Sequence, residues 1–215
     1  MSVKRLALLA LLVGAIIVAL LWFFGGRYEY RNLPPTADGP WVAFGDSLTE
    51  GYGASPGNDY PTLLGKSLGA TIRNLGKTGE TSEDGLKRVE EVAALKPRVV
   101  LLCFGGNDAL LGKSVSQTTA NVAQIIDRLH AEGSFVVLIG IRSASLRDRN
   151  ESHFKKLARE KEVFYVPDML KGLAFRPIYM SDAIHPNDVG YARIAERLRK
   201  ALKPVMPKLQ SGADG

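Results

Sequence analysis

Ser47 and His185 are the residue types expected of a nucleophile and its base. Ser47 lies in WVAFGDSLTEGYG, where Gly45 permits a sharp turn after a short apolar run. A serine hydroxyl is a weak nucleophile unless an adjacent base takes its proton. In SDAIHPN, Asp182 stands three residues before His185, so its carboxylate can hydrogen-bond the ring nitrogen Nδ1 and hold the tautomer that acts as a base. The order along the chain is serine, aspartate, histidine.

Acyl transfer also needs hydrogen-bond donors aimed at the oxyanion that forms on the attacked carbonyl. Gly79, in KTGET, offers an unobstructed backbone N–H ahead of a predicted helix. Asn107, in FGGNDALLG, offers a side-chain amide that two preceding glycines allow to approach closely. Each feature alone is more often a turn or a helix cap, and an isolated D-x-x-H is more often a surface turn. Their combination predicts one site.

The elements that must position these residues alternate along the chain. Apolar runs predict strands at 41–45, 70–75, 97–106, 135–141 and 162–167. Apolar periodicity predicts helices at 60–68, from 81 onward, around 122–129, at about 148–161 and along 191–202. Such alternation is typical of a parallel sheet with helices on both faces, where ligands bind beyond the carboxyl ends of the strands. The sequence therefore predicts an α/β, three-layer αβα sandwich with a five-stranded parallel sheet.

Two predicted helices begin with capping signals. Thr81 is followed three residues later by Asp84, which is the spacing of a capping box. Asn187 directly precedes the last helix and is a preferred N-cap residue. Both signals place a helix start next to a candidate site residue.

The blocks GDSLTEGYG, NLGKTGETS, FGGNDALLG and SDAIHP, in this order, resemble those of the SGNH hydrolases, the GDSL esterase/lipase family. Within it the chain is most similar to the bacterial thioesterase I, arylesterase and lysophospholipase group, over about residues 41–203. The resemblance implies a flavodoxin-like fold and serine-dependent hydrolysis of carboxylic esters or thioesters, with no metal or cofactor. It implies that the catalytic residues are Ser47, Asp182 and His185, and that the oxyanion hole is formed by Ser47, Gly79 and Asn107.

Two segments depart from that group. The loop after the fourth strand, IRSASLRDRN at 141–150, lacks the usual proline, asparagine and tyrosine, and KGLAFRPIYM at 171–180 is also distinct. We expect both to wall the acyl pocket, so that the chemistry transfers to this chain and the preferred substrate does not. The G-x-S-x-G elbow of other hydrolases is absent, because Thr49 occupies the second glycine position.

Other functions would use parts of the same pattern. An acyltransferase or a carbohydrate O-deacetylase would use the same triad. A non-catalytic module that binds phosphate or a nucleotide is a remote alternative, because Pro56 stands where G-x-G-x-x-G would place its third glycine and no G-K-[ST] follows. A catalytically inactive binding domain would not need oxyanion donors.

Residues 6–24, after Lys4 and Arg5, are apolar without interruption. As a helix they would span about 28 Å, close to the roughly 30 Å hydrocarbon core of a bilayer. Secretory signals have shorter apolar regions that end at small residues, whereas this run ends in aromatic residues suited to the membrane interface. We expect a transmembrane anchor with the catalytic domain periplasmic or otherwise extracytoplasmic. Secretion after cleavage of a signal sequence is the alternative.

The remaining organisation follows from composition. Residues 1–5 form a short N-terminal segment, and we expect a linker at 25–40, the hydrolase domain at 41–205 and a flexible tail at 206–215. The net charge is +6, but no basic run is interleaved with aromatic residues, so nucleic acid is not an expected partner. The expected partners are a small-molecule or lipid acyl ester and, through residues 6–24, the membrane. The single cysteine, Cys103, rules out an intramolecular disulfide and is expected in the core.

Overall fold

The computed structural model describes residues 14, 29–141 and 150–211 of the chain. The expected anchor at 6–24 therefore lies outside the described residues, apart from Gly14, as do the N-terminal segment and the first part of the expected linker. Within the described ranges, no helix is both long enough and apolar enough to cross a membrane.

Five parallel strands form one sheet in the order β2-β1-β3-β4-β5, which confirms the predicted α/β fold with a five-stranded parallel sheet. The strands are β1 Gly39–Gly45, β2 Ile72–Gly76, β3 Pro97–Cys103, β4 Phe135–Ile139 and β5 Phe164–Val166. Gly45 pairs with Gly76 on one side and with Cys103 on the other. Three strands thus end at the same level, and the segments that follow them leave the sheet at one edge.

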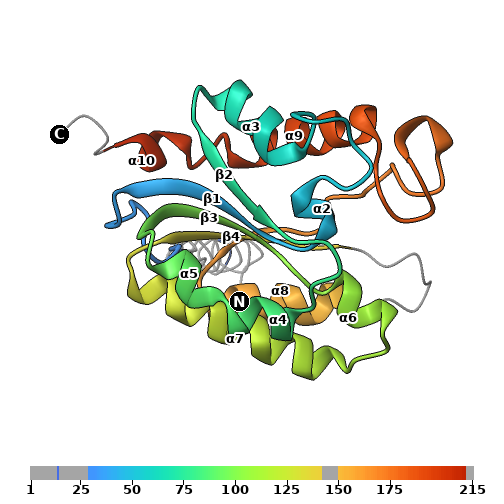
Figure 1. Cartoon of the computed structure of the whole chain (residues 1–215). Coiled ribbons are helices and arrows are strands. Elements are labelled where there is room, and N and C mark those ends of the chain that lie inside the picture. The colour runs from blue at the N-terminus through green and yellow to red at the C-terminus, as the bar shows by residue number, and fades with distance from the viewer. Residues whose placement is uncertain (1–13, 15–28, 142–149, 212–215) are drawn as a thin grey trace, which may run out of the picture.

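Helices cover both faces of the sheet (Figure 1). One face carries α3 Tyr60–Leu68, α9 Asp188–Leu202 and α10 Met206–Gln210. The other carries α4 Ser82–Lys87, α5 Val89–Ala93, α7 Val115–Ala131 and α8 Asn150–Glu160. Three short helices lie at or near the carboxyl edge: α2 Ser47–Glu50, α6 Gly106–Leu110 and the 3₁₀ turn η1 Pro177–Tyr179.

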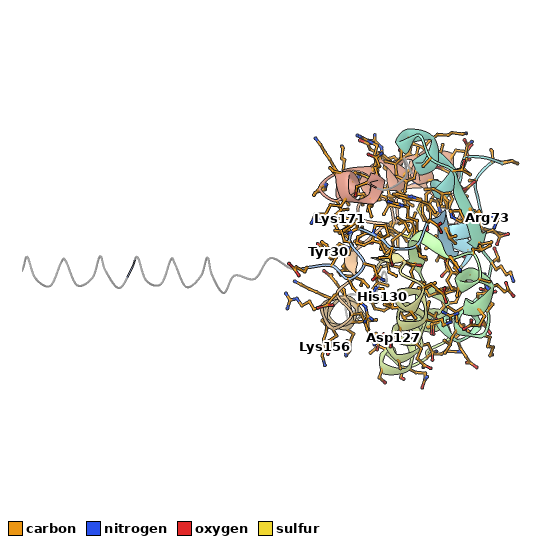
Figure 2. All side chains as sticks on the ribbon, turned by 90° about the vertical axis from the view of Figure 1, so that its left-hand side faces the viewer. Tyr30, Arg73, Asp127, His130, Lys156 and Lys171 are labelled. Carbon is orange, nitrogen blue, oxygen red and sulfur yellow. The ribbon has the colours of Figure 1, made fainter. Side chains whose placement is uncertain are left out.

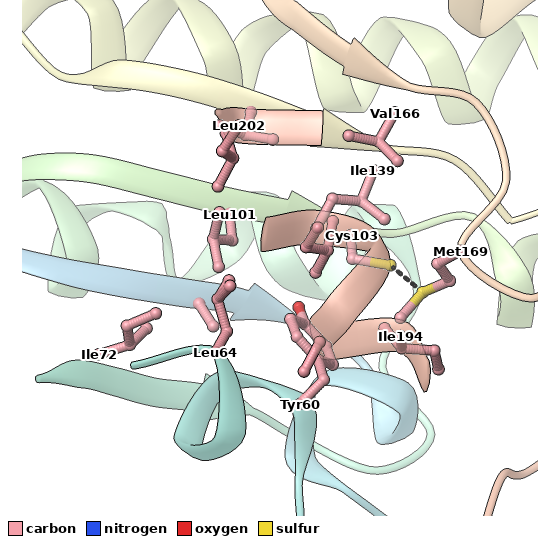
Figure 3. Close-up of a cluster of buried hydrophobic side chains, with 14 of the residues drawn as sticks. Tyr60, Leu64, Ile72, Leu101, Cys103, Ile139, Val166, Met169, Ile194 and Leu202 are labelled. Atoms are coloured by element: carbon pink, nitrogen blue, oxygen red, sulfur yellow. Dashed lines mark hydrogen bonds between the residues drawn. The ribbon is translucent and has the colours of Figure 1, made fainter. Parts of the chain in front are cut away.

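The core consists of two apolar layers, one on each side of the sheet. Alternate residues of β1 enter different layers: Ala43 packs with the layer under α3 and α9, and Phe44 with the layer under α5 and α7. This is the two-residue period of a strand buried on both faces. Cys103 is fully buried in the first layer, as expected, and its sulfur lies 3.5 Å from that of Met169 (Figure 3).

The region predicted as one helix from residue 81 is two helices with a break at Arg88. The predicted capping box is confirmed, since the side chains of Thr81 and Asp84 each accept from the other's backbone N–H. The break directs the buried side chain of Arg88 toward the sheet edge, where it donates to the carbonyl oxygens of Leu75, at 2.8 Å, and Gly45, at 3.4 Å. Apolar periodicity continues through the break and could not reveal it.

The described part of the expected linker packs on the domain at the amino ends of the strands. The Tyr30 ring lies 6.1 Å from that of Phe135 in β4 and 5.3 Å from that of Phe164 in β5. Asn32 donates from Nδ2 to the carbonyl oxygens of His130 and Ser134, both at 3.0 Å. Figure 2 views the molecule from the side on which Tyr30 and His130 lie.

Residues 206–215 were expected to form a flexible tail, but the first five of them form helix α10. Leu209 of this helix is 1% exposed, and its carbonyl accepts from Nε of the buried Arg98 at 2.8 Å. The Arg98 guanidinium also donates from Nη2 to Ser211 O at 2.6 Å. Apolar contacts of Met206 and Leu209 and the buried Arg98 guanidinium thus attach this segment, whose own sequence shows no long periodic pattern.

Candidate active site

Ser47 lies at the start of α2, directly beyond the end of β1, and is 7% exposed. Asp46 is the N-cap of this helix and accepts from Leu48 N at 3.0 Å. Gly45 is required for close packing, since a Cβ there would lie 2.2 Å from Thr49 Oγ1 and 2.4 Å from Cys103 O. The stretch GDS therefore combines a tight exit from the strand, a cap and a hydroxyl presented at the carboxyl edge.

His185 and Asp182, in the segment before α9, meet Ser47 at this edge. His185 Nε2 lies 3.1 Å from Ser47 Oγ, and His185 Nδ1 lies 2.7 Å from Asp182 Oδ2. The other carboxylate oxygen, Oδ1, accepts from the backbone N–H groups of Ile184, at 2.8 Å, and His185, at 2.7 Å. The structure thus brings all three predicted catalytic residues into one line of hydrogen bonds.

The charge of Asp182 is held by the same contacts. Partial desolvation raises the pKa of this carboxyl group, but the hydrogen bonds from the His185 ring and from two backbone N–H groups outweigh it, and the pKa falls to about 2. Asp182 is therefore ionised at any pH at which a neutral imidazole could act as a base.

The glycines on either side of Tyr52 bring that residue against the histidine. Gly51 and Gly53 have φ angles of 96° and 89°, and a Cβ on Gly53 would lie 2.1 Å from Ser181 Oγ. The Tyr52 ring consequently contacts the His185 ring at a tilt of 49°, with centroids 4.5 Å apart. Tyr52 was not among the site residues predicted from the sequence. The paired glycines of GYG were the available signal, because they mark a close approach of the backbone to another segment.

The two predicted oxyanion donors lie on adjoining turns. Asn107 Nδ2 donates to the carbonyl of Glu80 at 2.8 Å, so its amide lies beside the residue that follows Gly79. Gly79 has a φ of 83°, and an added Cβ would meet nothing within 4 Å. Within the part of the chain that the structure describes, the N–H groups of Ser47 and Gly79 donate to no protein acceptor. Both remain available to a ligand.

A pocket of about 220 Å³ opens beside Ser47, Asn107 and His185. Its apolar lining includes Leu110, Ile141, Leu170, Ala174, Phe175 and Met180. The expectation that 171–180 walls the pocket is confirmed by three of these residues. Of the loop at 141–150, Ile141 lines the pocket, and 142–149 lie outside the described residues.

Asp46 is a further carboxyl group at the pocket that sequence analysis did not assign. Burial raises its pKa to about 7, although the Leu48 N–H hydrogen bond opposes the shift, and the nearby charges of Asp108 and Glu80 raise it further. Only its position directly before Ser47 could have drawn attention to it.

A parallel α/β sheet that presents a serine hydroxyl, an imidazole and a carboxylate in hydrogen-bond sequence beside an apolar pocket defines the class of serine hydrolases. The GDSL-like lipase/acylhydrolase family model matches residues 43–193. The chain belongs to this family and is a carboxylester hydrolase.

Individual relatives agree with this membership. The chain is 34% identical over 176 residues to thioesterase 1/protease 1/lysophospholipase L1 of Escherichia coli, covering 77% of this chain and 84% of the relative. It is 29% identical over 177 residues to the esterase TesA of Pseudomonas aeruginosa, covering 77% and 88%. The crystal structure of TesA superimposes with a TM-score of 0.73 at 28% identity, covering 77% of this chain and 98% of that one.

Proposed function

We propose that this protein hydrolyses carboxylic esters or thioesters through an acyl-enzyme on Ser47. The observation that supports this most directly is the pair of hydrogen bonds that runs from Asp182 through His185 to Ser47, 2.7 Å and 3.1 Å long. Because the carboxylate accepts the Nδ1 proton, Nε2 is the free acceptor for the serine proton.

Two half-reactions follow from this arrangement. Ser47 Oγ attacks the substrate carbonyl while His185 Nε2 takes the hydroxyl proton, and the same nitrogen then protonates the departing alcohol or thiol. Water next attacks the acyl-serine ester, again losing its proton to Nε2. The carboxylic acid leaves as the proton returns to Ser47 Oγ, which restores the starting state.

The negative charge of each tetrahedral intermediate is proposed to lie among three donors. These are the N–H groups of Ser47 and Gly79 and the side-chain amide of Asn107. One amide hydrogen of Asn107 is used by the Glu80 carbonyl, and the second is left for the oxyanion. Donors fixed in advance of the reaction stabilise this charge without reorganisation.

The pocket supports a substrate with an apolar acyl group of intermediate length. An apolar protein cavity of about 150 Å³ accommodates benzene. The pocket here, at about 220 Å³, is larger than that and is open at the catalytic residues, so it has room for an acyl group longer than acetyl. The name of one relative includes thioesterase and lysophospholipase, which agrees with an acyl ester or thioester as substrate.

We also propose that residues 6–24 anchor the enzyme in a membrane, with a linker at 25–40 and the hydrolase domain at 41–205. The described residues 29–38 meet the domain at the amino ends of β4 and β5. Ser47 lies beyond the carboxyl end of β1, whose seven residues span about 23 Å. An anchor attached at the amino ends would leave the pocket facing the aqueous compartment.

Active-site labelling tests the catalytic proposal. Residues 29–215 are treated with an alkyl fluorophosphonate, and intact-protein and peptide mass spectrometry locate the adduct. We expect one adduct, on Ser47, with loss of p-nitrophenyl ester hydrolysis, and no adduct or hydrolysis for Ser47→Ala. Ester hydrolysis by Ser47→Ala at the parental rate would refute the proposal.

Fractionation tests the anchor. The full chain should sediment with membranes and resist extraction by high salt, whereas residues 29–215 should remain in the supernatant. If expression of the full chain instead yields a shortened protein that lacks the first residues and is free of the membrane, the segment is a cleaved signal sequence.

A further inference from the structure

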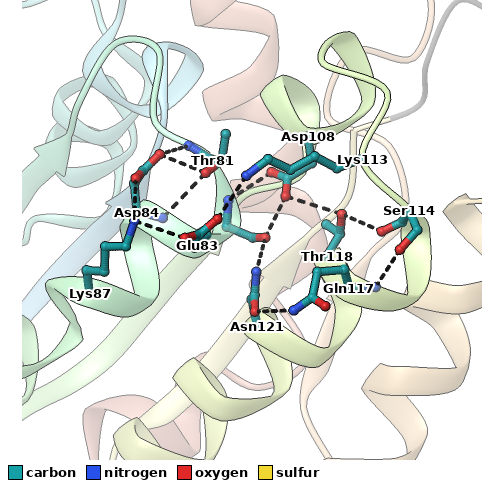
Figure 4. A network of polar contacts seen from close by, with 11 residues as sticks. Thr81, Glu83, Asp84, Lys87, Asp108, Lys113, Ser114, Gln117, Thr118 and Asn121 are labelled. Atoms are coloured by element: carbon teal, nitrogen blue, oxygen red, sulfur yellow. Dashed lines mark hydrogen bonds and ion pairs between the residues drawn. The ribbon is translucent and has the colours of Figure 1, made fainter.

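The carboxylate of Asp108, the residue that follows Asn107, is buried in a polar cluster with side chains of α4 and α7 (Figure 4). Asp108 as a whole is only 1% exposed. It accepts from the Ser82 backbone N–H at 2.8 Å, from the Ser82 hydroxyl at 2.6 Å and from the Thr118 hydroxyl at 3.2 Å. Asn121 extends the cluster, because its Nδ2 donates to Ser82 Oγ at 3.0 Å. One carboxylate therefore joins the start of α4 to α6 and α7.

This cluster connects the turns that carry the two proposed donors. Asn107 holds the turn after β2 by its hydrogen bond to Glu80 O. Asp108, the next residue, holds the same segment two residues further on, at Ser82. Two consecutive side chains thus fix residues 80–82 at two points. Gly79 directly precedes this segment, so the two attachments limit how far its N–H can move from the Asn107 amide.

We propose that Asp108 is a positioning residue that holds the Gly79 N–H and the Asn107 amide at the separation needed to bind the oxyanion. This inference rests on the proposed function, since it assigns Asp108 a task only if those two groups receive the charge. Asp108 itself touches no substrate atom. It acts through Ser82 and through its own backbone link to Asn107.

A carboxylate at this position can accept from all three donors that converge on Asp108. An asparagine that keeps its oxygen toward the Ser82 N–H would turn its NH₂ group toward the Ser82 and Thr118 hydroxyls, which would then have to accept instead of donate. The Ser82 hydroxyl already accepts from Asn121 Nδ2 and would lose its own buried acceptor, so the turn is expected to shift. A displacement of about 1 Å near a reacting group can reduce turnover by about 100-fold.

The test compares Asp108→Asn with Ser82→Ala, which keeps the backbone N–H bond to Asp108. We expect kcat for p-nitrophenyl ester hydrolysis to fall by about 10- to 100-fold in Asp108→Asn and by about 3- to 10-fold in Ser82→Ala. In both variants KM should change by less than about threefold, because the donors act mainly in the transition state. In Ser82→Ala, which leaves the charge of Asp108 in place, the pH profile of kcat/KM should keep its midpoint, because the hydrogen bonds of His185 are untouched.

Two comparisons separate positioning from general stability. Asn32→Ala removes two hydrogen bonds at the opposite end of the sheet, so it should lower the melting temperature without lowering kcat. In an Asn107→Ala background, Asp108→Asn should cost markedly less kcat than in the parent, because residues that act through one site are not additive.

Several results would overturn the inference. They are an unchanged kcat in folded Asp108→Asn, a loss that appears wholly in KM, or an effect that is fully additive with Asn107→Ala. If Asp108→Asn does not fold, Ser82→Ala decides by the same criteria. Fluorophosphonate labelling of the parent on Ser47 keeps the two proposals apart: labelling with a null effect at Asp108 rejects only the positioning role, whereas no labelling rejects the proposed function.

Discussion

The imidazole Nε2 of His185 lies 3.1 Å from the hydroxyl oxygen of Ser47, although 138 positions separate the two residues. Contacts outside the pocket hold the His185 segment close to the Ser47 segment. The carboxylate of Asp188, in the first turn of α9, accepts from Ser55 N at 2.7 Å and from Asn58 Nδ2 at 3.0 Å. The segment that carries His185 is thereby tied to the loop that follows the Ser47 helix.

Replacement of Asp182 by asparagine should lower kcat strongly, although the two side chains are almost the same size. Two backbone N–H groups bind Oδ1, so they would orient the asparagine amide with its oxygen on that side and its NH₂ toward His185 Nδ1. That NH₂ favours the tautomer in which Nε2 carries the proton and cannot act as a base. We expect kcat to fall by about 1,000- to 10,000-fold with little change in melting temperature. A loss below about tenfold would contradict this role of the carboxylate.

Asn107→Ala should reduce kcat by about 100- to 1,000-fold, the usual effect of removing one oxyanion donor. Asn107→Asp should be at least as slow, because a negative charge would then face the developing oxyanion. Steady-state kinetics with p-nitrophenyl butyrate provide the measurement. Activity of Asn107→Asp above that of Asn107→Ala would show that the side chain does not face the charge.

Ala174→Phe should shorten the preferred acyl chain. Ala174 lines the pocket, and a benzyl side chain there would occupy space proposed for the distal acyl carbons. We expect kcat/KM for the p-nitrophenyl ester of octanoate to fall by at least about tenfold, with the acetate ester within about twofold. Leu111→Phe is the matched control, because Leu111 is 68% exposed and does not line the pocket. Equal losses on both esters would place the acyl chain elsewhere.

His130 should make the protein less stable in acid. Burial lowers its pKa to about 4 from the ordinary value of 6.5, with a further contribution from Arg31, although the charge of Asp127 opposes the shift. Between these values the unfolded chain binds more protons than the folded one, so stability rises with pH through this window and is lost as the pH falls from about 6.5 toward about 4.

The measurement for His130 is the melting temperature at about pH 4.5 and about pH 7.5. His130→Leu should reduce the difference between the two, since within the described residues neither ring nitrogen of His130 has a hydrogen-bond partner to lose. His153→Gln, at an exposed position of α8, should leave the difference unchanged. An unaltered acid sensitivity in His130→Leu would reject this explanation.

Features of the fold that depend on neighbouring residues were predicted correctly from the sequence, whereas features that depend on contacts between distant segments were missed. The helix caps at Thr81 and Asn187 were predicted correctly, because a capping side chain bonds a backbone group within three residues. The strands were located from their apolar runs, but β3 ends at Cys103 rather than at 106, because Gly105 turns the chain with a φ of 117°. The break at Arg88 and helix α10 were missed, since both depend on buried guanidinium groups that reach distant carbonyls.

The residue types of the candidate site could be selected from the sequence, because nucleophile, base and donor chemistry resides in the side chain or in a glycine turn. Their meeting could not be derived from local spacing. It depends on β1 and β3 ending level at the sheet edge and on Asp188 holding α9 against the Ser47 segment. The contact of the Tyr52 ring with the His185 ring and the burial of Asp108 likewise appear only once distant segments pack.

The amino-acid sequence by itself determined the alternation of strands and helices, the caps and the set of groups able to perform acyl transfer, because each of these is encoded over a few neighbouring residues. Tertiary structure alone decided the distances between those groups, the apolar walls of the pocket and the hydrogen bonds between Ser82 and Asp108. Those features arise from contacts between segments far apart in the chain, whose geometry exists only after the sheet and its two helical layers have assembled.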